Sequence, residues 1–130
     1  MHKKLRSRLA WGLVSAVTLV LVAVFLREGT GQTAVIQDVS KSQKIILKAR
    51  HDKRRTGGMS VVVTGDIDGI ATIERSYSSG QRMYGPQKIG PGKVSFHAGG
   101  DWYDNQCIVY YEPGTVNSGQ LSIRYRFSQY

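Results

Sequence analysis

The sequence predicts an all-β domain, a small antiparallel sandwich or jelly roll of six to eight strands, preceded by one transmembrane helix. A long uncharged apolar run near the N-terminus indicates the helix. Short stretches rich in Val, Ile, Tyr and Thr follow, separated by glycine-containing pairs at intervals of about a dozen residues, as in sandwiches and barrels. The length of 130 residues leaves room for a single domain of this kind.

The N-terminal segment has the pattern of a membrane anchor. Residues 1–8 are basic and contain no acid, and the uncharged run extends over residues 9–26. As a helix at ~1.5 Å per residue, this run spans about 27 Å, close to the thickness of a bilayer's hydrocarbon core. Basic side chains are denser before the run than after it, which predicts a cytoplasmic N-terminus and an extracytoplasmic body. Residues 27–34 are expected to form a tether.

The alternative interpretation of this segment is a cleaved signal peptide. The apolar region of a signal peptide covers about 7–15 residues and ends at a small-x-small site. Here the run is longer, and the charged pair Arg27-Glu28 follows it. We therefore expect an uncleaved anchor. One face of the helix consists of small residues and predicts close packing against another helix. These residues are Gly12, Ser15 and Ala16.

The domain is expected over residues 35–130, with strands identified by alternation. The clearest strand covers residues 121–128, where apolar side chains alternate with polar ones that include Arg124 and Arg126. Residues 107–111 are apolar on both faces, which is typical of a central strand. Further strands are expected at residues 35–39, 45–49 and 93–98.

The middle of the chain predicts a hairpin. Residues 60–67 and 70–77 flank Asp68-Gly69, which is a signal for a type I′ turn. A two-residue loop would place the apolar side chains of the two strands on opposite faces. One extra residue restores a common face, and Gly65 is suited to host such a bulge. We therefore predict a bulge near Gly65 or a looser loop over residues 65–69.

Patterns that indicate catalysis or metal binding are weak. Cys107 is the single cysteine and lies in an apolar stretch, where a thiol behaves as a small hydrophobic group. His97 falls on the solvent side of its strand, and His51 lies in a charged run. Residues 65–69 and 99–105 pair carboxylates beside glycine, a pattern shared by calcium loops and ordinary turns. We expect turns here, no cofactor, no bound metal and no enzymatic activity.

The remaining candidates for function are surfaces. Residues 50–55 are strongly basic and form either a solvated loop or a contact to an anionic surface. Exposed aromatic side chains in loops either bind a partner or cover the end of the core. The candidate contact residues are Arg50, Lys53, Arg54, Arg55, Tyr84, Trp102 and Tyr103.

Together these features predict a single-pass protein of the cell membrane. Its extracytoplasmic sandwich is expected to act as a binding or accessory subunit of a membrane or envelope complex. The expected partners are the lipid bilayer and other subunits of that complex, and export argues against nucleic acid. The alternative is a membrane-tethered module that binds a glycan or calcium.

Overall fold

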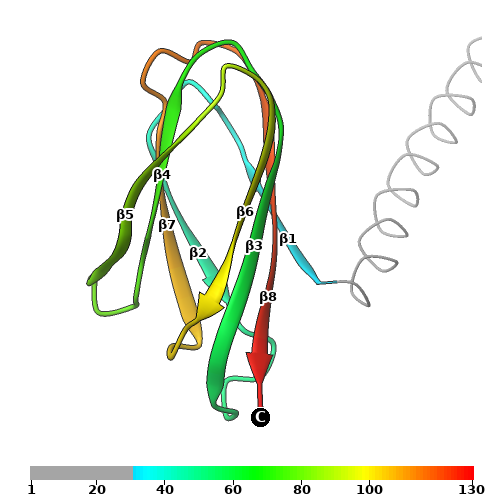
Figure 1. The fold of residues 1–130 in the computed structure, drawn as a ribbon, viewed down its shortest axis with the longest axis vertical. Helices are drawn as coiled ribbons and strands as arrows, with labels where there is room; N and C mark the ends of the chain where they lie inside the picture. The colour runs from blue at the N-terminus through cyan, green and yellow to red at the C-terminus, as the bar shows by residue number, and fades with distance from the viewer. Residues whose placement is uncertain (1–30) are drawn as a thin grey trace, which may run out of the picture. The chain divides into compact units, whose positions relative to one another are not determined.

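The computed structural model describes residues 31–130, which fold into two four-stranded antiparallel sheets (Figure 1). The strands are β1 (Gln32–Ile36), β2 (Gln43–Lys48), β3 (Thr56–Ile67), β4 (Ala71–Ser76), β5 (Arg82–Ile89), β6 (Gly92–Asp101), β7 (Gln106–Glu112) and β8 (Gly119–Gln129). The first sheet has the order β1-β8-β3-β6 and the second the order β2-β7-β4-β5. The predicted β-sandwich is therefore confirmed.

The expected N-terminal elements lie outside the described residues. They are the basic segment 1–8, the span 9–26 and its small-residue face of Gly12, Ser15 and Ala16. Within residues 31–130, no helix combines the length and the apolar character that a membrane crossing requires.

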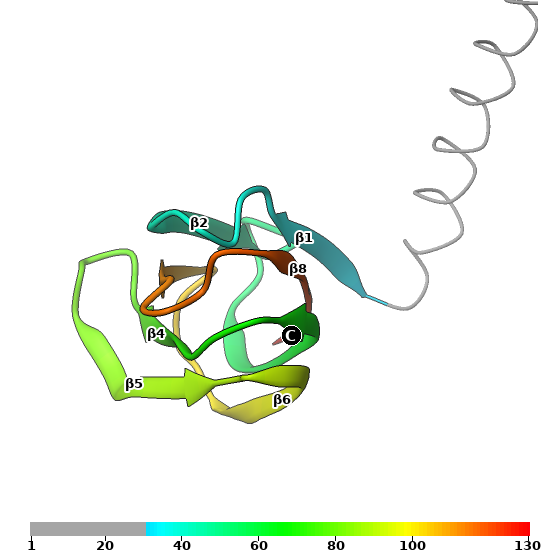
Figure 2. The same ribbon diagram turned by 90° about the horizontal axis from the view of Figure 1, so that it is seen from above.

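The strand pairs are nested along the chain. β4 pairs with β5, β3 with β6 and β2 with β7, while β1 neighbours β8. The chain thus folds back on itself once, between β4 and β5, and its two arms wind together as in a jelly roll. Seen from above, β1, β8 and β6 lie along one side of the sandwich, and β2, β4 and β5 lie along the other (Figure 2).

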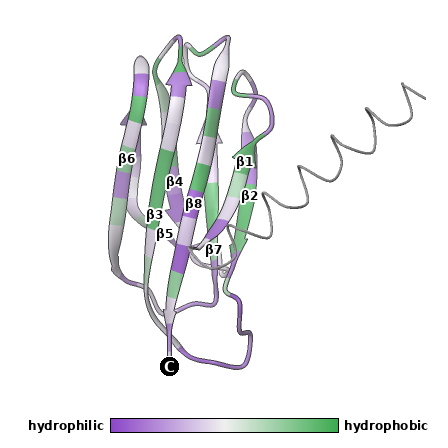
Figure 3. Cartoon of the chain, turned by 90° about the vertical axis from the view of Figure 1, so that its right-hand side faces the viewer, coloured by the Kyte–Doolittle hydropathy of each residue, from purple (hydrophilic) through white to green (hydrophobic). Residues whose placement is uncertain are grey.

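The core lies between the two sheets, and alternation along the strands fills it (Figure 3). In β8, Leu121, Ile123 and Phe127 are buried, while Arg124 and Arg126 are exposed, as predicted. Strand β7 lies between β2 and β4 in its sheet, which confirms the central position expected from its apolar sequence. Aliphatic side chains on facing strands thus share one buried layer, which is the main source of stability for a domain of this size.

The predicted hairpin between residues 60–67 and 70–77 is wrong. Strand β3 pairs with β6 and β8, while β4 belongs to the opposite sheet. The chain crosses between the sheets at Asp68-Gly69, so the apolar side chains of β3 and β4 face the same core from opposite sides. No bulge is then needed to bring them together. The register of β3 indeed runs without a shift past Gly65, and the irregularity lies between Thr56 and Gly58.

The start of β1 and the presence of β5 also differ from the expectation. β1 begins at Gln32, so residues 32–34 belong to the sandwich and not to the tether. β5 was not expected as a strand, because Gly85 and Pro86 interrupt its alternation. Tyr84 therefore lies in an edge strand and not in a loop. The structure shows that this strand is bulged, since three residues of β5 lie between the partners of Ile73 and Arg75, where a regular ladder has one.

Candidate binding surfaces

The basic run Arg50–Arg55 forms the loop between β2 and β3, and its side chains are exposed. The C-terminal strand fixes the backbone of this loop. Gln129 donates through Nε2 to the carbonyl oxygen of His51 (2.6 Å) and accepts at Oε1 from the His51 N–H (3.2 Å). Arg55 and Tyr130 exchange two backbone hydrogen bonds of 3.2 and 3.0 Å. The loop is therefore exposed, and its backbone is hydrogen-bonded to the end of β8 and to Tyr130.

Asn105 joins this loop to the loop between β6 and β7. Its Nδ2 donates to the carbonyl oxygens of Asp52 (2.9 Å) and Arg54 (3.1 Å). The β6–β7 loop carries Tyr103, whose side chain is exposed, and the exposed C-terminal Tyr130 lies beside Arg55. We call this surface the basic end. It consists of Arg50, Lys53, Arg54, Arg55, Tyr103 and Tyr130, near the C-terminus in Figure 1.

Trp102 does not belong to this surface, which corrects the expectation for it. Its side chain is 0% exposed, and its indole Nε1 donates to the carbonyl oxygen of Gln106 (2.9 Å). The ring packs against Tyr77 with centroids 4.5 Å apart. Trp102 therefore covers the end of the core, the second of the two alternatives for aromatic residues in loops. Its neighbour Tyr103, in the same loop, is 70% exposed.

A second candidate surface lies at β5 and β6, the edge strands of the two sheets, which are neighbours in Figure 2. It is a cleft of about 320 Å³. Its lining comes from β4, β5 and β6 and includes Ile73, Arg75, Tyr84, Gln87 and Phe96. The candidate contact residue Tyr84 lies here, so the structure separates it from the basic end.

Arg75 is the residue in this cleft that the sequence analysis missed. The register places it opposite Val109 of β7, on the side of the sheet that faces the core. Its guanidinium lies 4.9 Å from the ring centroid of Tyr84 and 5.6 Å from that of Trp102. A signal was present in the sequence. Ala71, Ile73 and Arg75 alternate, so a charge at the third position predicts a cation on the inner face.

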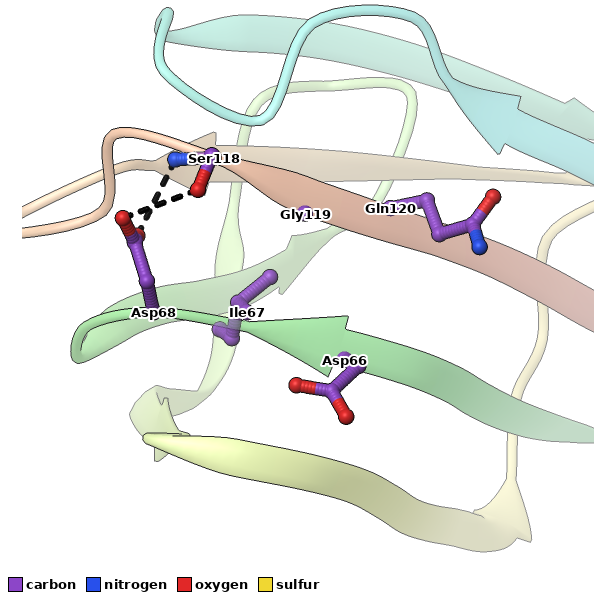
Figure 4. Close-up of a pocket in the computed structure, with 6 residues that line it drawn as sticks. All are labelled: Asp66, Ile67, Asp68, Ser118, Gly119 and Gln120. Atoms are coloured by element: carbon purple, nitrogen blue, oxygen red, sulfur yellow. Dashed lines mark hydrogen bonds between the residues drawn. The ribbon is translucent and has the colours of Figure 1, made fainter.

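The carboxylates of the two Asp-Gly segments do not converge on a metal-sized site. Asp68 accepts hydrogen bonds from the backbone N–H groups of Asn117 and Ser118 (2.8 and 3.0 Å) and from the Ser118 hydroxyl (3.0 Å). The carboxylate of Asp66 points in a different direction, away from this network (Figure 4). The backbone hydrogen bonds from Ser118 and Asn117 lower the pKa of Asp68. Asp68 thus holds a turn, as expected.

Asp104 has the same structural role near the basic end. It accepts hydrogen bonds from the backbone N–H and hydroxyl of Ser78 (2.7 and 2.6 Å) and from the N–H of Gln106 (3.0 Å). Partial burial alone would raise the pKa of Asp104, but these hydrogen bonds outweigh it and the pKa is lowered. Within residues 31–130, no cluster of three or more His, Cys, Asp or Glu side chains is arranged to hold a metal ion.

Cys107 and the two described histidines lie apart from one another. Burial raises the pKa of the Cys107 thiol to about 12, so it stays protonated at neutral pH and is a poor nucleophile. His97 is exposed on β6 and His51 belongs to the basic loop. Within residues 31–130, the thiol is thus buried in β7 while both histidines are exposed to solvent. Comparison with protein-family models and with curated proteins finds no match for this chain.

Proposed function

We propose that this protein is a membrane-anchored binding domain, and that its basic end contacts an acidic surface on another subunit of a membrane complex. The observation that carries the proposal is a set of exposed Arg, Lys and Tyr side chains on a backbone fixed by Asn105 and Gln129. Arg and Tyr dominate the energetics of protein interfaces. A backbone that is ordered before binding reduces the entropy lost in forming the complex.

The charges of Lys53, Arg54 and Arg55 are available to a partner. Among the described residues, the ion pairs join Lys41 to Asp38 and Arg82 to Glu74, both away from the basic end. Lys53, Arg54 and Arg55 make no ion pair within residues 31–130. An acidic partner would therefore gain their interaction without first breaking one inside the domain. Such complementarity mainly accelerates association and selects the partner.

The anchor supports the same proposal. The uncharged run 9–26 and the basic residues before it favour a single span with the sandwich outside the cytoplasm. A domain tied to a bilayer moves in a thin layer, which raises its effective concentration near other membrane-bound proteins. Weak contacts at the basic end then suffice for assembly. The small-residue face of Gly12, Ser15 and Ala16 supplies a second contact in the bilayer.

The test uses the full chain extracted from native membranes with a mild detergent. The wild type is expected to elute in a larger assembly during size-exclusion chromatography. The double variant Arg54→Glu/Arg55→Glu should elute as a smaller species while remaining folded. The matched control is Lys88→Glu/Lys93→Glu, which makes the same charge change on exposed residues at the other end of the sandwich. A monomeric wild type, or equal effects of the two double variants, would contradict the proposal.

Gly12→Leu tests the contribution of the helix separately. A leucine at this position keeps the neighbouring helix from approaching closely, so the assembly should weaken without any change in the sandwich. Leu21→Ala, which also alters the size of one side chain in the run but lies away from this face, should leave the assembly intact. If Gly12→Leu has no effect, the span contributes no packing contact and the basic end acts alone.

A further inference from the structure

We propose that the cleft between β5 and β6 binds a carboxylated sugar of the uronate class, with Arg75 holding the carboxylate and Tyr84 packing against the sugar ring. This site is separate from the basic end and does not depend on the function proposed for it. We call it the Arg75–Tyr84 cleft, and its lining residues are those named above.

The guanidinium of Arg75 is the central observation. Arg75 is partly buried, and the rings of Tyr84 and Trp102 lie 4.9 and 5.6 Å from it. Among the described residues, it forms no ion pair. A guanidinium carries its N–H donors along the edges of its plane, in a fork that matches a carboxylate. Because Arg75 lines the cleft, these donors can meet an anion that enters it.

A partly buried cation without a partner has a preference for anions. Removing a guanidinium from bulk water weakens its hydration, and a carboxylate that forms two parallel hydrogen bonds compensates for this. None of the described residues that line the cleft is acidic. A ligand carboxylate therefore meets no acidic side chain among these lining residues.

The backbone at Tyr84 shows that the position of its ring is imposed by the fold. Tyr84 has a φ of +68°, the sole non-glycine residue with positive φ among residues 31–130, and Gly85 follows with +69°. A bulky side chain in this conformation is strained by about 1–3 kcal/mol. Gln87 stabilises the bulge by donating through Nε2 to the carbonyl oxygen of Tyr84 (3.1 Å). The result is a ring held above Arg75 with more than half of its surface, 57%, exposed.

The size and lining of the cleft favour a hydroxylated ring. A volume of about 320 Å³ lies at the lower limit for ligand pockets, which suits one monosaccharide. The exposed face of Tyr84 and the partly buried Phe96 offer apolar contact to the C–H face of a sugar. Gln87 and the backbone of β6, an edge strand with unpaired N–H and C=O groups, offer hydrogen bonds to hydroxyls.

The test titrates glucuronate into the full chain in detergent micelles and follows the amide signal of Gly99, which lines the cleft, by NMR. We expect a saturable shift with a Kd of about 1 mM, typical of one charged contact and one stacked ring. Arg75→Gln should raise this Kd about tenfold or more, because a hydrogen-bonded charge pair is lost. Arg124→Gln, which removes an exposed arginine from the outer face of β8, should leave it unchanged. Absence of a saturable shift would overturn the proposal.

A second variant distinguishes a loss of binding from a loss of folding. Tyr84→Gly removes the aromatic ring but also relieves the positive-φ strain, so its Tm should equal or exceed that of the wild type. The Kd for glucuronate should nevertheless rise about fivefold or more. A stable Tyr84→Gly variant that still binds glucuronate as tightly as the wild type would contradict the role of the ring.

Two further ligands decide the chemical class. Glucose has the ring and hydroxyls without the carboxylate, and benzoate has the carboxylate and a ring without hydroxyls. The proposal expects both to bind at least about tenfold more weakly than glucuronate. If glucose bound with the same Kd as glucuronate, Arg75 would not be holding a carboxylate. If benzoate bound with the same Kd, the site would be specific for aromatic acids and not for sugars. Either result overturns the assignment.

Discussion

The two ends of the sandwich are built in different ways. At the end that carries the β3–β4, β5–β6 and β7–β8 loops, backbone packs against backbone. An added Cβ at Gly69 would lie 2.5 Å from the carbonyl oxygen of Thr115, and one at Gly119 would lie 2.1 Å from that of Asp66. At the basic end, side chains such as that of Asn105 hold the loops by hydrogen bonds to backbone carbonyl oxygens. We call the first of these ends the glycine end.

The two ends therefore have different roles: the glycine end supports the fold, and the basic end presents side chains to solvent. The glycine end brings chain segments so close that side chains are excluded, and this leaves little surface on which to vary chemistry. The basic end is held by hydrogen bonds to backbone carbonyls, and these leave the long side chains of Arg54 and Arg55 free to extend. A loop whose backbone is fixed by a neighbour's side chain can present any residue to solvent. The comparison therefore predicts high sensitivity to substitution at the crowded glycines of one end and at Asn105 of the other, and high tolerance at the exposed residues of the basic loop.

The largest effect is expected for Gly119→Ala at the glycine end. This residue combines a φ of +129° with a Cβ position 2.1 Å from a backbone oxygen, so both strain and overlap must be relieved by moving β3 or β8. We expect a loss of about 3 kcal/mol or more in the free energy of unfolding, measured by urea denaturation. The control is Gly80→Ala, which has a φ of +92° but no atom within 4 Å of the added Cβ. It should cost only about 1 kcal/mol, and equal losses would mean that crowding is not the cause.

The next effect is expected for Asn105→Ala, which removes the side chain that joins the two loops of the basic end. Its amide and carbonyl groups make hydrogen bonds to Asp52, Arg54 and Thr56, and each is worth about 0.5–1.5 kcal/mol. We therefore expect a loss of about 2 kcal/mol. Asn117→Ala changes the same residue type in the β7–β8 loop and should stay within about 0.5 kcal/mol. A reversed order would contradict the proposed difference between the ends.

A smaller and pH-dependent effect is expected for Asp104→Asn. The folded pKa of Asp104 lies below its ordinary value of 3.8, so the ionised carboxylate stabilises the folded state above that pH. This stabilisation is lost as the pH falls through the lowered folded pKa. The variant should be less stable than the wild type by about 1 kcal/mol at neutral pH, allowing for solvent screening. Thermal melts from pH 7 down to 2 should show the two Tm values converging below pH 3.8. A constant difference would exclude ionisation as the cause.

The smallest effect on stability is expected for Arg54→Glu/Arg55→Glu. Both side chains are exposed and unpaired within the described residues, so the free energy of unfolding should change by no more than about 0.5 kcal/mol. The same variant is expected to disrupt the assembly described above. Urea denaturation measures the effect of this variant on stability, and size-exclusion chromatography measures its effect on assembly. The two effects can therefore be told apart. A strongly destabilised variant would mean that the basic end also supports the fold.

Local patterning predicted much of this domain. The alternation of Leu121, Ile123 and Phe127 with arginines placed β8 correctly, and the apolar stretch at 107–111 predicted a central strand. Residues 50–55 form the exposed loop between β2 and β3, and its contact to an anionic surface stays a prediction. Alternation failed at β5, because the backbone of Tyr84 and Gly85 turns into the left-handed region and interrupts the period of two.

The sequence by itself determined which side chains of the regularly alternating strands, such as β8, face the core, because that property depends only on the period of two along the chain. It could not determine which sheet a strand joins. The Asp68-Gly69 pair is equally compatible with a hairpin turn and with a crossing between sheets, and only the contacts with residues 115–118 decide between them. The tertiary structure likewise buried Trp102 and left Arg75 between two aromatic rings, because both outcomes depend on residues that are distant in the chain.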